Sequence, residues 1–253
     1  MERKSIYVAF CNQKGGVGKS AFTTLAASYL HYAENKNVVV IDCDYPQYSI
    51  HAMRERDKGM VTSSDMYKEM MVTQFEAIGK KAYPILTVKS EDAIGVANRF
   101  VSESPVPIDV VFFDLAGTVN SAGILKATVS MDYLFCPVTS DRLVMKSSLV
   151  YASTLQDFLK QNPAAPLKSI FLFWNMLVKS ENRELYDAYT TIINKLNLNL
   201  LQTEIPFTVK YKKEMSLSSR QVFRSTFFPP DKSLLKGSNL DVFMDEVCQI
   251  IKV

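Results

Sequence analysis

Histidine and cysteine are scarce in this chain of 253 residues, which has two histidines and four cysteines. The cysteines, Cys11, Cys43, Cys136 and Cys248, are far apart and show no CxxC spacing. Because zinc sites and disulfide frameworks need closely spaced or more numerous ligands, the sequence indicates neither. Three of the cysteines lie in or beside apolar runs, where a free thiol usually packs as a small hydrophobe. This usage fits the reducing cytosol, and we expect a cytoplasmic protein.

Long hydrophobic runs and strong net charge are missing too. No apolar run approaches the ~20 residues of a membrane-spanning helix, and the N-terminal residues 1–4 are not followed by the apolar segment of a signal peptide. We therefore expect neither export nor membrane insertion. The net charge of +3 does not by itself indicate a nucleic-acid protein, but residues 205–236 carry seven Lys and Arg against two acids.

Six short apolar runs are too short for typical helices and too continuous for half-exposed strands. They predict buried parallel strands at 6–10, 38–41, 110–113, 133–138, 170–174 and 200–203. Helical spacing follows at 21–32, 92–102, 143–160, 181–196 and 239–253. This alternation predicts an α/β fold of three layers, with helices on both faces of a mostly parallel sheet. Residues 227–231 must form a loop, but no linker is evident, so we expect one domain over residues 1–253.

A glycine-rich segment, residues 12–20 with the sequence NQKGGVGKS, joins the first predicted strand to the first predicted helix. Glycines let backbone N–H groups converge on phosphate oxygens, and the helix N-terminus adds partial positive charge. Lys19 supplies a point charge for the β- and γ-phosphates, and Ser20 supplies a hydroxyl for Mg²⁺. The expected nucleotide-binding residues here are Lys14, Gly15, Gly16, Val17, Gly18, Lys19, Ser20 and Ala21.

Two further apolar runs end in acidic residues. The first continues as Asp42-Cys43-Asp44-Tyr45-Pro46-Gln47, and the second as Asp114-Leu115-Ala116-Gly117-Thr118. Ligands of open α/β sheets bind at the carboxyl ends of the strands, where these carboxylates would gather. Aspartate also favours helix caps, so capping remains the alternative for Asp42 and Asp44.

The segment KGGVGKS, with its second lysine Lys14, resembles the deviant Walker A motif of the ParA/MinD (Soj-like) ATPase family. A strict GxxxxGK[ST] pattern would need glycine at position 13, where Gln13 stands. The resemblance implies an ATP-dependent homodimer that hydrolyses ATP slowly with Mg²⁺. It also implies that Lys14 reaches across the dimer interface to the partner's nucleotide and acts there as a catalytic residue.

The two acidic segments extend this resemblance. DCDYPQ is similar to the family's DxDPQ switch with Tyr45 inserted, which implies that Asp44 orients the attacking water and that Asp42 supports the water shell of Mg²⁺. Asp114 matches the Walker B aspartate and should hold Mg²⁺ through water. The family usually has a proline pair just after this residue, whereas Ala116-Gly117 stand here.

Resemblance over nearly the whole chain also implies adenine contacts by Asn175 and Pro206, although an asparagine at a strand end is often only a turn former. Among relatives, the chain looks nearest to ParA-like TraA-type conjugal transfer proteins. That nearness rests on DCDYPQ, DLAGT, residues 173–175 and the segment FRST at 223–226. It implies a role in DNA partition or conjugative transfer, with a partner protein that stimulates hydrolysis.

Such a role predicts sequence-independent DNA binding by a basic surface. The candidates are Lys210, Lys212, Lys213, Arg220 and Arg224, with Tyr211 and Phe223 among them, and an ordinary solvated basic face is the alternative.

Other functional classes share this type of phosphate-binding loop. A MinD-like membrane regulator would need lysines flanking the apolar stripe of its C-terminal helix. The segment 239–253 has three acids and only Lys252, so we expect it to pack on the core. One cysteine, Cys136, cannot hold an iron–sulfur cluster. A MinD-like positioning protein, a small-molecule synthetase and a non-hydrolysing scaffold stay open.

Overall fold

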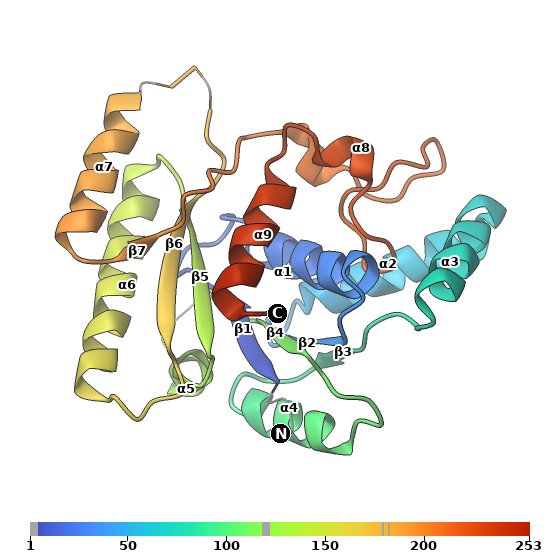
Figure 1. The fold of residues 1–253 in the computed structure, drawn as a ribbon, viewed down its shortest axis with the longest axis horizontal. Helices are drawn as coiled ribbons and strands as arrows, with labels where there is room; N and C mark the ends of the chain where they lie inside the picture. The colour runs from blue at the N-terminus through green and yellow to red at the C-terminus, as the bar shows by residue number, and fades with distance from the viewer. Residues whose placement is uncertain (1–4, 118–121, 179, 182) are drawn as a thin grey trace.

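The computed structural model describes residues 5–117, 122–178, 180–181 and 183–253. Residues 1–4, and Thr118 of the second acidic segment, lie outside the described residues. Within the described ranges, seven strands form one sheet in the order β3-β2-β4-β1-β5-β6-β7, and every strand pair is parallel. Helices flank the sheet on both sides (Figure 1). The three-layer α/β class expected from the sequence is confirmed.

Six of the strands lie on the predicted apolar runs, whereas β3 was not predicted. The strands are β1 Ile6–Phe10, β2 Val38–Asp42, β3 Ile85–Thr87, β4 Val110–Asp114, β5 Tyr133–Val138, β6 Ser169–Trp174 and β7 Asn199–Leu200. The α-helices are α1 Lys19–Ser28, α2 Ser49–Ser63, α3 Asp65–Ile78, α4 Ala93–Glu103, α5 Ala122–Val129, α6 Arg142–Gln161, α7 Arg183–Lys195, α8 Lys232–Leu235 and α9 Leu240–Ile251. A π-turn, η1 Tyr29–Ala33, extends α1, and a short 3₁₀ helix, η2, spans Val209–Lys212.

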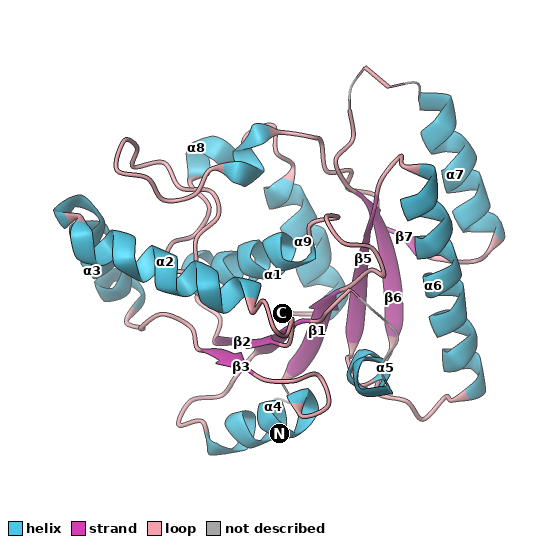
Figure 2. Ribbon diagram, turned by 180° about the vertical axis from the view of Figure 1, so that it is seen from behind, coloured by secondary structure: helices cyan, strands magenta, loops and turns pink. Residues whose placement is uncertain are grey.

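The strands bury both of their faces, so their sequences read as continuous apolar runs. Along β1, Ala9 packs in the layer that α4, α5, α6 and α7 complete, whereas Val8 and Phe10 pack in the opposite layer with α1 and α9. Figure 2 shows the same layers from behind, turned by 180° about the vertical axis from the view of Figure 1. Alternation of side chains along a strand produces this division.

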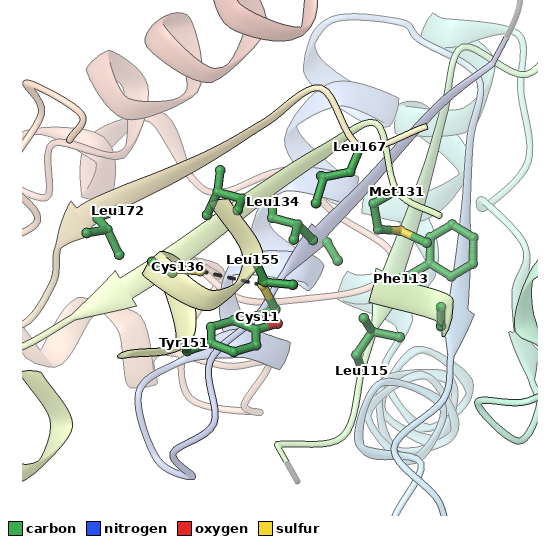
Figure 3. Close-up of a cluster of buried hydrophobic side chains, with 14 of the residues drawn as sticks. Cys11, Phe113, Leu115, Met131, Leu134, Cys136, Tyr151, Leu155, Leu167 and Leu172 are labelled. Atoms are coloured by element: carbon green, nitrogen blue, oxygen red, sulfur yellow. Dashed lines mark hydrogen bonds between the residues drawn. The ribbon is translucent and has the colours of Figure 1, made fainter. Parts of the chain in front are cut away.

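Three cysteines are buried, as their apolar surroundings predicted: Cys11, Cys43 and Cys136 are each at most 3% exposed. Cys11 follows β1 directly, and its Sγ lies 3.6 Å from the Sγ of Cys136 on β5 (Figure 3). Tyr151 and Leu155 of α6 belong to the same buried cluster. Burial also raises the pKa of the Cys43 thiol, so that thiol is neutral.

The C-terminal helix α9 packs on the core, as expected. Phe243, Met244 and Val247 are fully buried, and the carboxylate of Glu246 accepts hydrogen bonds from the backbone amides that follow β7. Asn239 stands at its N-cap, but its side chain donates to the Glu204 carbonyl instead of capping the helix. Among the described helices, none combines the length and the apolar character that crossing a bilayer requires.

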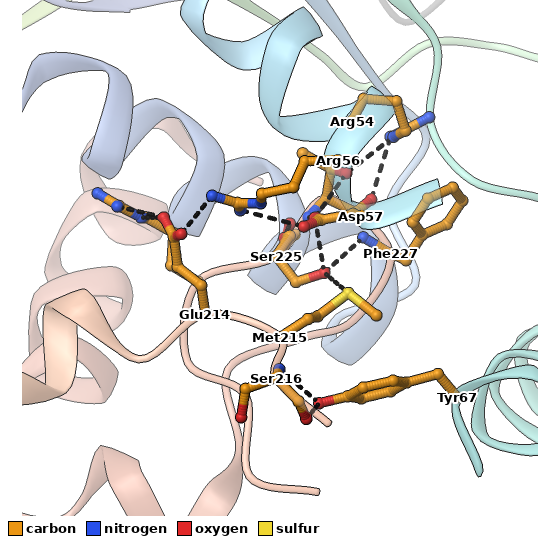
Figure 4. A network of polar contacts seen from close by, with 12 residues as sticks. Arg54, Arg56, Asp57, Tyr67, Glu214, Met215, Ser216, Ser225 and Phe227 are labelled. Atoms are coloured by element: carbon orange, nitrogen blue, oxygen red, sulfur yellow. Dashed lines mark hydrogen bonds and ion pairs between the residues drawn. The ribbon is translucent and has the colours of Figure 1, made fainter. Parts of the chain in front are cut away.

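A buried carboxylate fastens α2 to the segment at 225–226. Asp57 of α2 is fully buried and accepts hydrogen bonds from the Thr226 backbone N–H at 2.8 Å, the Thr226 hydroxyl at 3.0 Å and the Ser225 hydroxyl at 3.1 Å. Its other oxygen lies 3.1 Å from a guanidinium nitrogen of Arg56 (Figure 4). Residues about 170 positions apart are thereby held together beside the first helix.

Asp57→Ala should therefore lower the free energy of unfolding by about 3 kcal/mol, because it leaves the buried donors of Ser225 and Thr226 without their acceptor. Urea denaturation measures the change. Asp157→Ala is the matched control, since Asp157 is 63% exposed and its ion pair among the described residues is with Lys160 in the same helix. The control should stay within about 0.5 kcal/mol of the wild type. Equal effects from the two variants would contradict this account of the network.

Candidate functional site

Loops at the carboxyl ends of β1, β2, β4 and β6 surround a cavity of about 680 Å³. Residues 206–212 and Arg224 close its remaining side. Parallel α/β sheets bind ligands at this edge. The residues that line it are Gln13, Gly15, Gly16, Gly18, Lys19, Ser20, Ala21, Phe22, Asp44, Tyr45, Gln47, Ser49, Ala116, Gly117, Asn175, Met176, Pro206, Phe207, Thr208, Tyr211, Lys212 and Arg224.

The glycine-rich loop needs its glycines for two separate reasons. Gly16 and Gly18 have φ of +78° and +93°, which side-chain-bearing residues rarely adopt. A β-carbon at Gly18 would also lie 3.3 Å from the amide nitrogen of Asn175. Gly18 is the N-cap of α1, so the loop ends at a helix N-terminus whose free N–H groups suit an anion.

Two buried asparagines hold the loop from opposite sides. Asn12 donates to the Pro137 carbonyl and to the Ser148 hydroxyl, both at 2.7 Å, and accepts from the Lys14 backbone N–H at 3.0 Å. Asn175 donates to the Val17 carbonyl at 3.0 Å. These contacts fix the loop before any ligand binds. The sequence analysis missed the role of Asn12, because its acceptors Pro137 and Ser148 are more than a hundred residues away.

The two lysines of the loop differ in position. Lys19 Nζ donates to the Lys14 carbonyl at 3.1 Å and belongs to the cavity wall. Lys14 itself is exposed and is not among the residues that line the cavity. Gly117 lies against Lys19, since a β-carbon at this glycine would come within 2.9 Å of Lys19 Nζ. Because Gly117 stands where the family usually has a proline, there is room here for the amine of Lys19.

Two buried carboxylates stand side by side on β2 and β4, where Asp42 and Asp114 are register partners. Asp42 accepts hydrogen bonds from the backbone N–H groups of Ile50 at 3.0 Å and His51 at 2.9 Å, in the first turn of α2. The capping alternative is thus the one that the structure favours for Asp42. Burial still raises its pKa, and the backbone hydrogen bonds oppose that shift.

Asp114 has no such support. It is 1% exposed, and within the described part of the chain neither of its carboxylate oxygens has a hydrogen-bonding partner. Burial raises its pKa from 3.8 to about 7, whereas the nearby Ser20 hydroxyl and Lys19 ammonium favour the ionised form. A buried carboxylate without a partner is costly unless a cation binds it. The residues present therefore fit Mg²⁺, with Ser20 as a further oxygen ligand.

Asp44 and Tyr45 form the cavity wall that begins after β2. The Asp44 carboxylate accepts from the Ser49 hydroxyl at 3.4 Å, and its carbonyl accepts from the Tyr48 N–H at 2.8 Å. The inserted Tyr45 is 58% exposed, stacks edge-on with Tyr48 and has Lys89 Nζ 5.6 Å from its ring centre. Asp44 thus remains at the cavity despite the insertion.

Asn175 follows β6, and Pro206 follows β7. Met176 N–H donates to the side-chain Oδ1 of Asn175 at 2.9 Å, and Leu177 pairs with Pro206 in a parallel bridge. Both belong to the cavity wall. Since Nδ2 and Oδ1 of Asn175 are both hydrogen-bonded, the clearest contact of this side chain is with the glycine-rich loop, and adenine contact stays a prediction.

The expected basic residues do not share one environment. Lys212, Lys213 and Arg220 are exposed, whereas Lys210 donates to the Lys236 carbonyl and Arg224 is ion-paired with Glu214. Lys212 and Arg224 belong to the nucleotide-sized cavity. Phe223 is fully buried, and Tyr211 packs on it with ring centres 5.1 Å apart. The expectation that these aromatic side chains belong to a surface patch was wrong for Phe223, because it is part of the core.

The structure brings together most of the predicted site residues, with Val17 of the loop buried, and its cavity includes residues to which the sequence analysis assigned no nucleotide contact. The additional cavity residues are Gln13, Phe22, Tyr45, Gln47, Ser49, Ala116, Gly117, Met176, Phe207, Thr208 and Tyr211. Most have no local signature, because they reach the cavity from separate loops. Lys212 and Arg224 were identified from sequence, but as DNA contacts.

Three solved structures share the fold. The cell division ATPase MinD of Pyrococcus furiosus superposes with a TM-score of 0.62 at 13% identity, covering 98% of this chain and 100% of its own. A plasmid partition protein from Borrelia burgdorferi bound to AMPPNP superposes with a TM-score of 0.55 at 17% identity, covering 86% of this chain and 93% of its own. Cobyrinic acid a,c-diamide synthase from Mycobacterium smegmatis, with bound ADP and magnesium, superposes with a TM-score of 0.55 at 18% identity, covering 81% of this chain and 88% of its own.

The ligands in these neighbours, AMPPNP in one and ADP with magnesium in another, agree with the expected ATP and Mg²⁺. No curated protein sequence matches the chain. Nearness to TraA-type proteins stays a prediction. The model of the CobQ/CobB/MinD/ParA nucleotide binding domain matches residues 8–219, which contain the glycine-rich loop and both acidic segments. This chain belongs to the CobQ/CobB/MinD/ParA nucleotide-binding family.

Proposed function

We propose that this chain is a ParA-like ATPase, a switch that binds Mg-ATP, dimerises through the bound nucleotide and hydrolyses it slowly. The observation that carries the proposal is the meeting of Lys19, Asp44 and Ala116-Gly117 at one cavity, with the bare Asp114 carboxylate beneath it. We propose residues 1–253 as a single ATPase domain. Its setting is DNA partition or conjugative transfer, with a partner protein that stimulates hydrolysis.

Within this proposal, Mg²⁺ would be held by the Ser20 hydroxyl and by Asp114, and it would neutralise part of the triphosphate charge. No cluster of three or more His, Cys, Asp or Glu side chains occurs among the described residues, and phosphate oxygens and water would supply the other ligands of the metal. Lys19 exchanges its contact with the Lys14 carbonyl for the phosphates. Asp44 orients the attacking water.

Two other functions occur with this type of nucleotide-binding domain, and experiments can distinguish them from the proposed switch. A MinD-like positioning regulator would bind a protein partner or a membrane surface, but the apolar face of α9 is occupied by the core. A small-molecule synthetase would transfer the γ-phosphate to a carboxylate, and one structural neighbour is a synthase of that fold. Phosphate release from ATP without any added acid separates the switch from the synthetase.

The first test is Lys19→Ala. Loss of the only loop lysine on the cavity wall should abolish ATP binding, because the phosphate charge then lacks its cationic partner in the same chain. Calorimetry with Mg-ATP measures the affinity. Unchanged affinity would contradict the assignment of the site.

The second test concerns Asp114→Asn and the effect of pH. Because the pKa of Asp114 is raised to about 7, the folded state holds a proton that the unfolded state releases, so this residue costs stability increasingly as pH rises toward and through 7. The advantage of the Asn variant over the wild type without metal should grow by about 2–3 kcal/mol between pH 5 and pH 8.

The same variant should lose the extra thermal stabilisation that Mg²⁺ gives to the ATP-bound wild type, because the metal loses its carboxylate. Thermal melts with ATP, with and without Mg²⁺, provide this control. A stability difference that does not change with pH, together with intact Mg²⁺ dependence, would refute the metal assignment.

The third test concerns the dimer. Lys14 is exposed outside the cavity, so it is free to reach a partner's phosphates and to neutralise charge in the transition state. Lys14→Ala should bind ATP as a monomer with little turnover. Asp44→Ala should bind ATP and accumulate as a dimer, because only the orientation of water is lost. Light scattering with ATP distinguishes them, and a wild type that stays monomeric at micromolar concentration would rule out the mechanism.

The fourth test concerns DNA. Lys213 and Arg220 are exposed and belong to the stretch of excess positive charge, so non-specific DNA binding should require ATP and weaken steeply as salt rises. Lys213→Ala and Arg220→Ala should weaken it for every sequence. Gel shifts with ATP, ADP and no nucleotide measure this. Absence of any complex in low salt with ATP would favour a purely protein-directed switch.

A further inference from the structure

One basic residue of the 205–236 segment stands apart from the others. Arg224 lines the nucleotide cavity, and its side chain is 26% exposed. Its Nε donates to one carboxylate oxygen of Glu214 at 3.0 Å, and one Nη donates to the same oxygen. The opposite oxygen of Glu214 accepts from Arg56 of α2. Figure 4 shows Glu214 and Arg56 facing one another.

These contacts form a row of alternating charges that ends at the cavity. The row begins at the fully buried Asp57, passes through Arg56 and Glu214, and ends at Arg224. Each inner member has an opposite charge on both sides. Among the described residues, the ion pair of Arg224 is the one with Glu214, and the other side of the guanidinium faces the cavity that Arg224 lines.

The hydrogen-bonding capacity of Arg224 supports the same point. A guanidinium has N–H donors on all three nitrogens, and in the described part of the chain the side-chain contacts of Arg224 are those to a single oxygen of Glu214. Donors of the other Nη therefore remain available. Guanidinium groups bind phosphate oxygens with directional, charge-assisted hydrogen bonds.

We propose that Arg224 is a nucleotide contact, which donates to a phosphate oxygen of the ATP bound in its own chain, while Glu214 positions it. This inference rests on the proposed ATP site and deepens it. It removes Arg224 from the predicted DNA surface and assigns it to the cavity. Glu214 holds the guanidinium in place before binding, so less side-chain freedom is lost when the phosphate arrives.

The test compares three variants by calorimetry with Mg-ATP and no DNA. Arg224→Gln should weaken ATP binding about 10- to 100-fold, the usual size for a charge-assisted hydrogen bond. Arg224→Lys should recover part of the loss, because the charge returns. Arg99→Gln is the matched control, since Arg99 is exposed and lines a different cavity, and its affinity for ATP should equal that of the wild type.

A purely structural role for Arg224 makes a different prediction. Arg56→Gln breaks the other ion pair of Glu214 without removing any group from the cavity wall. It should lower the melting temperature about as much as Arg224→Gln does, yet change ATP affinity by less than about threefold. Affinity losses of equal size in the two variants, or an Arg224→Gln affinity within twofold of the wild type, would overturn the inference.

Two further measurements separate this inference from the proposed function. If wild type binds no ATP, the proposed function itself fails. If wild type binds and Lys19→Ala does not, an unchanged Arg224→Gln overturns only the role of Arg224. Repeating the titrations with ADP identifies the phosphate: loss with both nucleotides indicates the α- or β-phosphate, and loss with ATP alone indicates the γ-phosphate.

Discussion

An unpaired carboxylate in the interior is the constraint on which the rest of the site depends. Asp42 and Asp114 stand on neighbouring strands, but only Asp42 is hydrogen-bonded, through the first amides of α2. Asp42 therefore holds the N-terminus of α2, whereas Asp114 has no hydrogen-bond partner among the described residues and suits a cation. The glycine-rich loop, held by Asn12 and Asn175, supplies the matching anion site beside it. Mg-ATP would satisfy both at once.

The sequence was sufficient to predict the parts that depend on local pattern. Fully buried parallel strands have continuous apolar runs, and β1 and β5 were predicted with their observed bounds, while β7 proved shorter than expected. The glycine-rich loop has a mechanism that is readable from residue type and order, so Lys19 and Ser20 were placed at the cavity. The burial of α9 followed from the scarcity of lysine in it.

Parts that depend on distant contacts were not predictable in the same way. The helices α2 and α3 lack a strong apolar stripe, and α2 is held by Asp42 and Asp57, whose partners lie in other segments. Arg224 carries no local sign of its role, because its position depends on Glu214 and on α2. Charge counting along the chain grouped it with exposed lysines, from which the fold separates it.

The central claim is that hydrolysis needs two copies of the chain, because the exposed Lys14 serves a partner's nucleotide. Phosphate release per protomer, measured with saturating Mg-ATP over a wide range of protein concentration, tests this most directly. Turnover per protomer should rise with protein concentration and then level off once nearly all protomers are in dimers. Turnover per protomer that stays constant down to nanomolar protein, while light scattering shows monomers, would contradict the account.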